Sequence, residues 1–137
     1  MKTELVPLTY RHLQEMGETD QWQNRMRLGG IAFALLADGK PVAAGGIVRL
    51  WGKVGKVWTI QTEEAKRSCF LMRRIHKHAK EQFPLIRAAM GLERVEGETK
   101  ADEPSHCRWA ERFNFKEEGV MRKYRMGQDY IRYAWTS

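Results

Sequence analysis

Cysteine and proline are scarce in this chain, which has 2 cysteines, Cys69 and Cys107, and 4 prolines among 137 residues. The cysteines do not form a C-x-x-C pair, and each lies in a predicted helix. We interpret them as buried or half-buried thiols in a reducing compartment. A domain of this length buries about two thirds of its unfolded surface, so it needs no disulfide or metal to fold.

Long apolar runs are also missing. The longest is Ile31–Ala37, which has the length of a strand and is far too short to span a bilayer. The first residues, Met1 to Pro7, contain no apolar core of the kind that a secretory signal has. We therefore expect a soluble protein of the cytoplasm with no membrane partner.

The chain lacks internal repeats, low-complexity stretches and a Pro, Gly or Ser linker, so we interpret residues 1–137 as one domain. What it has in excess is positive charge, with 24 Lys and Arg against 17 Asp and Glu. A net charge of +7 raises affinity for phosphate groups, whether of nucleic acid or of a nucleotide-based cofactor. Because these cations are interleaved with acids, the pattern favours a solvated face over a nucleic-acid site.

The first half of the chain predicts a strand, two short helices and a three-strand meander. In order, these are Lys2–Pro7, Thr9–Met16, Thr19–Leu28, Ile31–Ala37, Pro41–Leu50 and Lys56–Thr62. In the second helix we expect Trp22, Met26 and Leu28 to face inward. Asp38-Gly39 predicts a hairpin turn, and Gly45-Gly46 predicts a bulge or a close backbone approach.

A helical period then replaces the strand pattern. Apolar residues form one stripe over Glu64–Phe83, at Ala65, Cys69, Met72, Ile75, Ala79 and Phe83. Thr62 is the expected cap, and Pro84 is expected to end the helix. The outer face of this helix is basic.

The last third predicts a strand, a short helix and a hairpin. Val95, Gly97 and Thr99 fall on one face of the strand Arg94–Thr99, with Glu96 and Glu98 on the other. Pro104 begins the helix and Asn114 ends it, and the hairpin joins Phe115–Tyr124 to Asp129–Trp135. The whole order predicts an α/β (α+β) fold, a mixed sheet with helices on both faces.

The segment from Arg94 through Gly119 carries a family resemblance. A strand leads to a helix that ends in the triplet Phe113-Asn114-Phe115, and Gly119 follows. The ordered pattern, with a weaker match over Val42–Phe83, resembles the GNAT superfamily of N-acetyltransferases, in particular its short, divergent bacteriophage members. The resemblance implies a mostly antiparallel sheet whose central parallel strands, Lys56–Thr62 and Arg94–Thr99, splay apart.

The resemblance also implies acetyl-CoA as the cofactor. Its pantetheine arm would lie between the splayed strands, and its pyrophosphate would rest on backbone N–H groups at the start of the next helix. The cofactor-binding residues implied in this way are Ile60, Gln61, Thr62, Ala65, Lys66, Arg67, Ser68 and Glu103.

The sequence departs from the family pattern at three places. The segment Gln61–Ser68 lacks the glycines of the pyrophosphate loop, and it reads equally as an ordinary capped helix. Glu63 and Glu64 would repel a pyrophosphate, whereas the basic residues after them would attract one. Glu103 stands where the family has Asn, and Ala110 stands where it has the Tyr that protonates the leaving thiolate.

Candidate catalytic residues follow from what acyl transfer needs. Glu96 or Glu98 could serve as a general base, although alternating acids on a strand are more often solvated. Tyr124 or Tyr130 could replace the missing acid, and His106, close to Glu103, could move a proton. The other histidines show no metal-binding spacing, so we predict no metal site.

The sequence is compatible with three functions. The first is an acetyl-CoA-dependent N-acetyltransferase acting on an amine of a small molecule or a protein. The second is a catalytically degenerate phage protein of the same fold that binds a virion component or a host protein, in the virion or in the host cytoplasm. The third, motivated only by charge, is a nucleic-acid-binding module.

Overall fold

The computed structural model describes all 137 residues and has the mixed architecture that the sequence predicts. In order, its elements are β1 (Thr3–Pro7), α1 (Tyr10–Glu15), α2 (Gln21–Leu28), β2 (Ile31–Ala37), β3 (Lys40–Trp51), β4 (Val54–Gln61), α3 (Glu63–Lys66), α4 (Cys69–Ala89), β5 (Arg94–Lys100), α5 (Pro104–Arg112), β6 (Lys116–Arg125) and β7 (Gln128–Thr136). None of the helices combines the length and the apolar character that a bilayer span requires.

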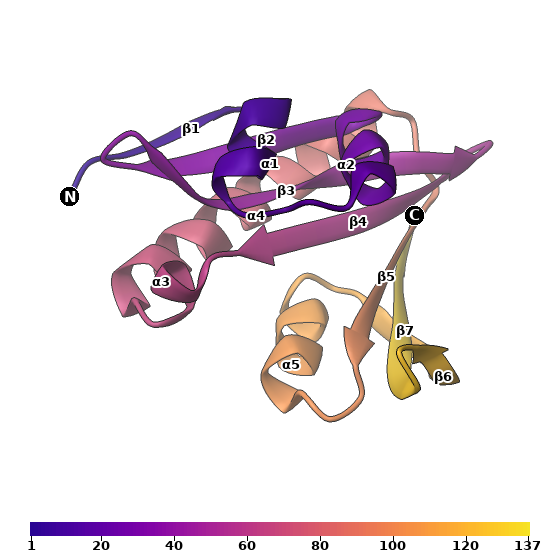
Figure 1. The fold of residues 1–137 in the computed structure, drawn as a ribbon. Helices are drawn as coiled ribbons and strands as arrows, with labels where there is room; N and C mark the ends of the chain where they lie inside the picture. The colour runs from indigo at the N-terminus through magenta and orange to yellow at the C-terminus, as the bar shows by residue number, and fades with distance from the viewer.

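The strands form one 7-stranded sheet in the order β1-β2-β3-β4-β5-β7-β6. Every neighbouring pair is antiparallel except β4 and β5, which run parallel. Helices α1 and α2 lie on one face of the β1–β4 half, and α4 lies on the other (Figure 1). The expected fold class is therefore confirmed.

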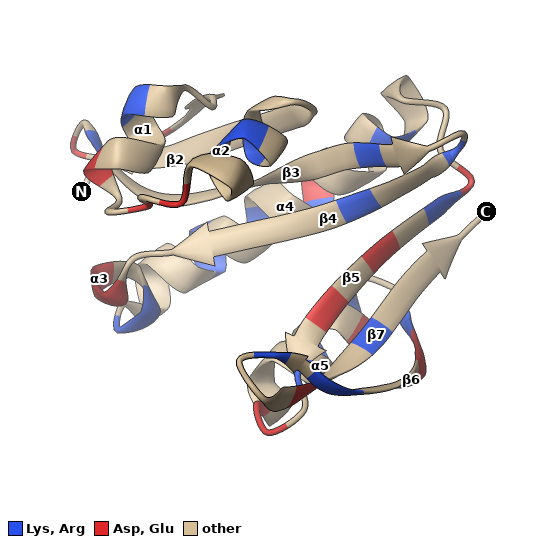
Figure 2. Cartoon of the chain, turned by 45° about the vertical axis from the view of Figure 1, so that its right-hand side comes forward, with Lys and Arg blue, Asp and Glu red and all other residues tan.

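The parallel pair is short. β4 and β5 are joined only at Val54–Arg94, Gly55–Val95 and Lys56–Glu96, and they separate beyond that point (Figure 2). β5 then pairs with β7 along its whole length, from Arg94–Thr136 to Lys100–Tyr130. The sheet is thus divided into two wings that meet at one end of β4 and β5, as the splayed strands of the resemblance imply.

Two clusters of buried apolar side chains hold the wings to their helices. The larger one joins α4 and α5 to both wings through Phe83, Ile86, Val95, Phe115 and Tyr133, among others. The smaller one, which includes Leu35, Val42 and Leu71, seats the first turns of α4 against the β2–β3 hairpin. Helices α4 and α5 therefore cover one side of the space between the two wings.

Local signals in the sequence were confirmed at the caps and turns. The Thr9 side chain accepts the backbone N–H of His12, which caps α1. Asp38 and Gly39 both have positive φ, as the two-residue hairpin turn requires. Asn114 follows α5 with φ 64°, and the Trp109 and Phe113 rings lie 4.4 Å apart between centroids.

The second helix is turned differently from the prediction. Trp22 is 75 % exposed and Leu28 is also exposed, whereas Asn24 and Arg27 are buried. The reason is a polar network, because the Asn24 amide donates to the carbonyl of Glu18 and the Arg27 guanidinium bonds the Glu18 carboxylate. Buried polar groups that are fully bonded in this way compete well with apolar ones for the inner face.

The predicted long helix is two helices. Arg67 ends α3, and the Ser68 side chain caps α4 by accepting the N–H of Leu71. Cys69, at the first position of α4, is exposed, so the prediction that it belongs to the buried apolar stripe was wrong. Cys107 is half-buried, as expected. Pro84 lies inside α4 rather than at its end, because buried Ile86 continues the apolar face beyond it.

Of the two interpretations of Gly45-Gly46, the close approach is the correct one. A Cβ at Gly46 would lie 2.4 Å from the carbonyl oxygen of Ile31 on β2. The register shift between β2 and β3 falls instead between Leu35 and Leu36.

Candidate functional site

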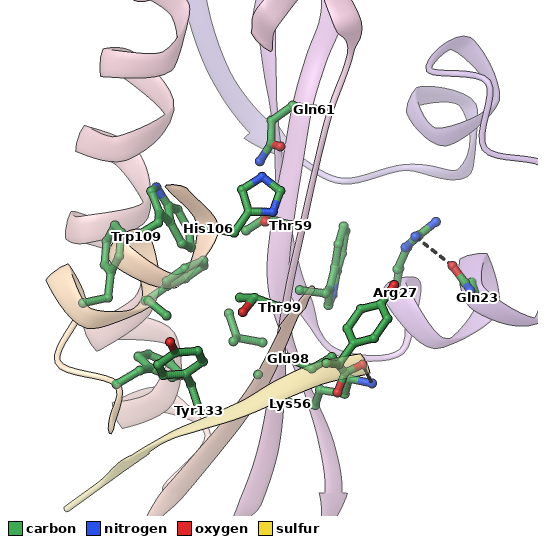
Figure 3. A pocket seen from close by; sticks show the side chains of 18 of the residues that line it. Gln23, Arg27, Lys56, Thr59, Gln61, Glu98, Thr99, His106, Trp109 and Tyr133 are labelled. Carbon is green, nitrogen blue, oxygen red and sulfur yellow. Dashed lines mark hydrogen bonds and ion pairs between the residues drawn. The ribbon is translucent and has the colours of Figure 1, made fainter. Parts of the chain in front are cut away.

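A cavity of about 400 Å³ occupies the space that opens between β4 and β5. Its walls come from both strands, from α2, α4 and α5, and from the β6–β7 hairpin (Figure 3). Because the two strands stop pairing after Lys56 and Glu96, the cavity passes between the wings of the sheet rather than lying on one face.

One wall of this cavity is an open strand edge. From Val57 to Gln61, β4 pairs with β3 on one side and has no strand partner on the other. Every second backbone N–H and C=O of such an edge points into the gap, and these groups need hydrogen-bond partners. An extended chain with amide groups fits this edge.

Alternation along β4 gives the cavity two chemically different sides. Lys56 and Trp58 point to the α2 side, where the Arg27 guanidinium lies 5.4 Å from the Trp58 ring centroid. Thr59 points to the other side and contacts the space over Gly45 that the Phe83 ring also borders. The α2 side carries the charged groups, and the α4–α5 side is mainly aromatic.

Glu98 is the carboxylate of the α2 side. Its Oε1 lies 2.8 Å from Lys56 Nζ and 3.3 Å from an Arg125 guanidinium nitrogen, and its side chain is only 10 % exposed. The Tyr124 hydroxyl donates to the other carboxylate oxygen at 3.3 Å. Three side chains therefore fix the position of the Glu98 carboxylate at the point where the strands part.

The other two predicted catalytic residues lie outside the cavity wall. Glu96 bonds Arg94 at 2.9 Å and Arg132 at 3.3 Å, which links β5 to β7. Tyr124 is exposed on β6 and reaches the site through its hydrogen bond to Glu98 and through its ring, which lies 5.6 Å from the Tyr130 ring between centroids. Tyr130, the alternative donor, does line the cavity.

The predicted cofactor segment is spread over a strand end and a helix. Gln61 lines the cavity at the end of β4, while Ile60 lies on β4 paired with Ala44 and takes no part in the lining. Thr62 accepts the N–H of Ala65, so it caps α3 as predicted.

The backbone N–H groups of residues 65–68 are already bonded. The N–H of Ala65 donates to the Thr62 hydroxyl, and that of Lys66 donates to the Thr62 carbonyl. The N–H of Arg67 donates to the carbonyl of Glu63, and that of Ser68 donates to the carbonyl of Ala65. They are therefore not open to a pyrophosphate in this structure. The N–H groups of Cys69 and Phe70, in the first turn of α4, have no acceptor within that helix. The helix N-terminus with unbonded N–H groups is therefore that of α4 rather than that of α3.

Glu103 and His106 meet at the start of α5. His106 Nδ1 lies 2.8 Å from a Glu103 carboxylate oxygen, and Glu103 makes no side-chain cap bond to the helix. His106 lines the cavity, so the expected pair for proton movement lies at its rim.

The aromatic side of the cavity is built by α4 and α5. The His76 ring meets the Trp109 ring edge-on at 5.5 Å between centroids. Burial lowers the pKa of His76, and nearby Arg112 lowers it further, so the imidazole is neutral at physiological pH. No group of three or more His, Cys, Asp or Glu side chains is placed to hold a metal ion.

Sequence reasoning missed Tyr133 and Arg27 as site residues. Tyr133 lines the cavity from β7 and is 3 % exposed, and Arg27 lines it from α2. The position of Tyr133 depends on its pairing with Gly97 across β5 and β7, and no local pattern encodes that register. The polar face of α2 could have indicated Arg27 as a site residue. It was overlooked because Trp22 and Leu28 were expected to form the inner face of this helix.

No protein-family model matches the sequence, and no curated protein matches it significantly. Solved structures do match over almost the whole chain. The IAA acetyltransferase from Bacillus cereus ATCC 14579 superimposes with a TM-score of 0.75 at 12 % identity, covering 99 % of this chain and 100 % of that one. The ribosomal-protein-S18-alanine N-acetyltransferase from Escherichia coli gives 0.75 at 14 %, covering 98 % and 94 %.

A GNAT-family acetyltransferase from Bacillus anthracis gives a TM-score of 0.71 at 10 % identity, covering 99 % of this chain and 95 % of that one. At these identities the likeness concerns the backbone. The chain has the GNAT acetyltransferase fold.

Proposed function

We propose that this protein is an acetyl-CoA-dependent N-acetyltransferase that acts on an amine of a small molecule or a protein. The observation that carries the proposal is the parting of β4 from β5 after Lys56 and Glu96, with a cavity of about 400 Å³ along an open β4 edge. Solved acetyltransferases with the same fold over 98–99 % of the chain support the reaction class.

The residues of the cavity fit an acetylated pantetheine arm. The open edge of β4 would hold its amide groups, and Trp109 and Phe113 would exclude water from its α5 side. Bound acetyl-CoA would supply a thioester carbonyl for attack by an amine. The amino end of α4 after Ser68 and the exposed side chains of Lys66 and Arg67 would hold its pyrophosphate, in place of the N–H groups of 65–68.

We assign the general base to Glu98. Of the three catalytic candidates, Glu96, Glu98 and Tyr124, it is the one that lines the cavity. Its carboxylate lies among Lys56, Arg125 and Tyr124, which fix its position, and it would take the amine proton directly or through a water. Glu96 and Tyr124 would act by positioning Glu98 and its strand.

A screen of amines tests this proposal. The purified protein is incubated with acetyl-CoA and a panel of amino acids, polyamines and peptides, and thiol release and acetylated products are measured. We expect turnover with one class of amine and a loss of about 100-fold or more for Glu98→Gln. Binding of acetyl-CoA without transfer to any amine would favour the second candidate below.

The second candidate is a catalytically degenerate protein of this fold that binds a phage or host protein. The observation in its favour is the α3 segment, where Glu63 and Glu64 are exposed and the N–H groups of residues 65–68 are internally bonded. The phage resemblance, and a location in the host cytoplasm or the virion, remain predictions that belong with it. Failure to bind acetyl-CoA at millimolar concentration would select this candidate.

A further inference from the structure

Two cations share one carboxylate where the strands part. Lys56 Nζ and an Arg125 guanidinium nitrogen lie 2.8 and 3.3 Å from the same oxygen of Glu98, and neither has a second ion-pair partner. All three side chains line the cavity, and Figure 3 shows Lys56 and Glu98 together at one end of it. This group of three, the charged corner, therefore has one unit of positive charge in excess.

Arg27, the other arginine in the cavity wall, adds nothing to this excess. Its guanidinium lies 3.2 Å from the Glu18 carboxylate, which balances its charge. Figure 3 shows it turned toward Gln23, whose side-chain oxygen accepts a hydrogen bond from it at 3.0 Å. The excess therefore belongs to Lys56 and Arg125. An ammonium group has three N–H donors and a guanidinium has five, so both residues keep donors for a second carboxylate.

An unpartnered indole lies on the same side of β4 as Lys56. Trp58 follows Lys56 by two residues, so both side chains point to the α2 side. The Trp58 Nε1–H is buried in the cavity wall without a hydrogen-bond partner, and buried donors of this kind are rare. An oxygen of a bound ligand would supply the missing partner. The other unpartnered indole of the cavity, that of Trp109, lies on the α5 side.

The excess charge lies directly beside the proposed base. Because Lys56 and Arg125 contact Glu98, an acceptor whose amine reaches Glu98 meets both cations with the atoms next to its nitrogen. A carboxylate at that position makes charges of opposite sign alternate across the charged corner, whereas the further ammonium groups of a polyamine would face two cations. The amide that follows a peptide N-terminus has no charge to balance them. An α-amino acid has its amine and its carboxylate on one carbon, which matches this spacing.

We propose that the acceptor is a free α-amino acid, an inference that rests on the proposed function. Its carboxylate binds Lys56 and Arg125, and its amine faces Glu98. In the transfer, the neutral amine nitrogen bonds to the carbonyl carbon of the thioester, and the carbon–sulfur bond breaks with its electron pair on sulfur. The nitrogen gives one proton to Glu98, the sulfur takes one up from water, and the products are an N-acetylamino acid and CoA.

Matched acceptors test the role of the carboxylate. Acetyl transfer is measured at saturating acetyl-CoA for the common amino acids, for the primary amide of each, for spermidine and for short peptides. We expect the best amino acid to exceed its amide by about 100-fold or more in kcat/KM, because the amide leaves the two cations unbalanced. The amine of the amide is the less basic of the two, so its larger neutral fraction works against this difference.

Arg125→Gln separates binding of the carboxylate from positioning of Glu98. Loss of a cation that binds the carboxylate should lower the preference for the amino acid over its amide about tenfold, mainly through KM for the amino acid. Arg125→Lys should keep most of the preference. Arg122→Gln is the matched control, because Arg122 is exposed on the same strand and lies outside the cavity wall. An equal loss for amino acid and amide in Arg125→Gln would show that Arg125 acts through Glu98 alone, and would overturn the inference.

Binding without turnover gives a second readout. In calorimetry with saturating CoA, which carries no acetyl group, we expect the amino acid to bind wild type at least tenfold more tightly than its amide. Equal values for amino acid and amide, or faster transfer to spermidine or to a peptide, overturn the amino-acid acceptor and leave the acetyltransferase proposal standing. Transfer to none of these amines overturns the proposed function itself.

Discussion

The ion pair between Lys56 and Glu98 offers a quantitative test of the geometry at the strand junction. It joins β4 to β5 just beyond their last backbone pair, with 21 % and 10 % of the two side chains exposed. Replacing Glu98 with Gln keeps the shape of the side chain but leaves Lys56 and Arg125 without their carboxylate. We therefore expect Glu98→Gln to destabilise the protein as well as to slow transfer.

The magnitude follows from distance and burial. Two unit charges about 4 Å apart attract by about 4 kcal/mol at an effective dielectric constant of about 20. Partial removal of both groups from water offsets much of this attraction. A net coupling of about 1 to 2 kcal/mol between Lys56 and Glu98 remains. A loss of that size corresponds to a fall in Tm of about 3 to 8 °C, which is the least that we expect for Glu98→Gln because Arg125 loses its carboxylate as well.

A double-mutant cycle measures this coupling directly. Urea unfolding of wild type, Lys56→Gln, Glu98→Gln and the double variant gives the four free energies of unfolding, and their combination isolates the pair. Arg11→Gln, which breaks an exposed i, i+4 pair with Glu15, is the matched control and should change stability by less than about 0.5 kcal/mol. A coupling energy of zero between Lys56 and Glu98 would refute the buried bridge between the strands.

Two further predictions concern the rest of the fold. Gly46→Ala forces a Cβ to within 2.4 Å of the Ile31 carbonyl oxygen, so we expect a loss of about 2 kcal/mol or more in urea unfolding, against a negligible change for an alanine at exposed Lys116. Burial lowers the pKa of both His76 and His78 in the folded state, so the unfolded chain binds more protons below about pH 6.5. As the pH falls through the lowered folded-state pKa values, the stability that these residues contribute above that pH is lost. His76→Phe should reduce this loss of stability between about pH 7 and pH 5. A pH dependence that is unchanged in His76→Phe would contradict the burial of this ring.

Features encoded within a few residues were predicted well from the sequence. The Thr9 cap, the Asp38-Gly39 turn and the left-handed Asn114 depend on local backbone preferences, and the structure has each of them. The break between α3 and α4 was missed because the apolar stripe continues across it, while the Ser68 cap that starts the second helix is an equally local but weaker signal.

The site was predictable only in outline. The opening between β4 and β5 came from the family resemblance, and the place where it begins, after Lys56 and Glu96, came from the strand register. Tyr133 enters the cavity because β7 pairs with β5, which lie far apart in the sequence. Trp22 was placed inward because apolar spacing cannot show that Asn24 and its polar partners fill the inner face of α2.

Whether the gap between β4 and β5 admits an extended thioester arm is measured most directly by acetyl-CoA titration of wild type and Gly97→Val. The valine would stand on β5 in the cavity wall, where even a Cβ lies 3.0 Å from Val57, and Glu117→Val on exposed β6 is the matched control. We predict that wild type and Glu117→Val bind acetyl-CoA alike in calorimetry, and that Gly97→Val folds but binds at least tenfold more weakly. Equal affinity in all three proteins, or no binding by wild type at millimolar acetyl-CoA, would contradict the account.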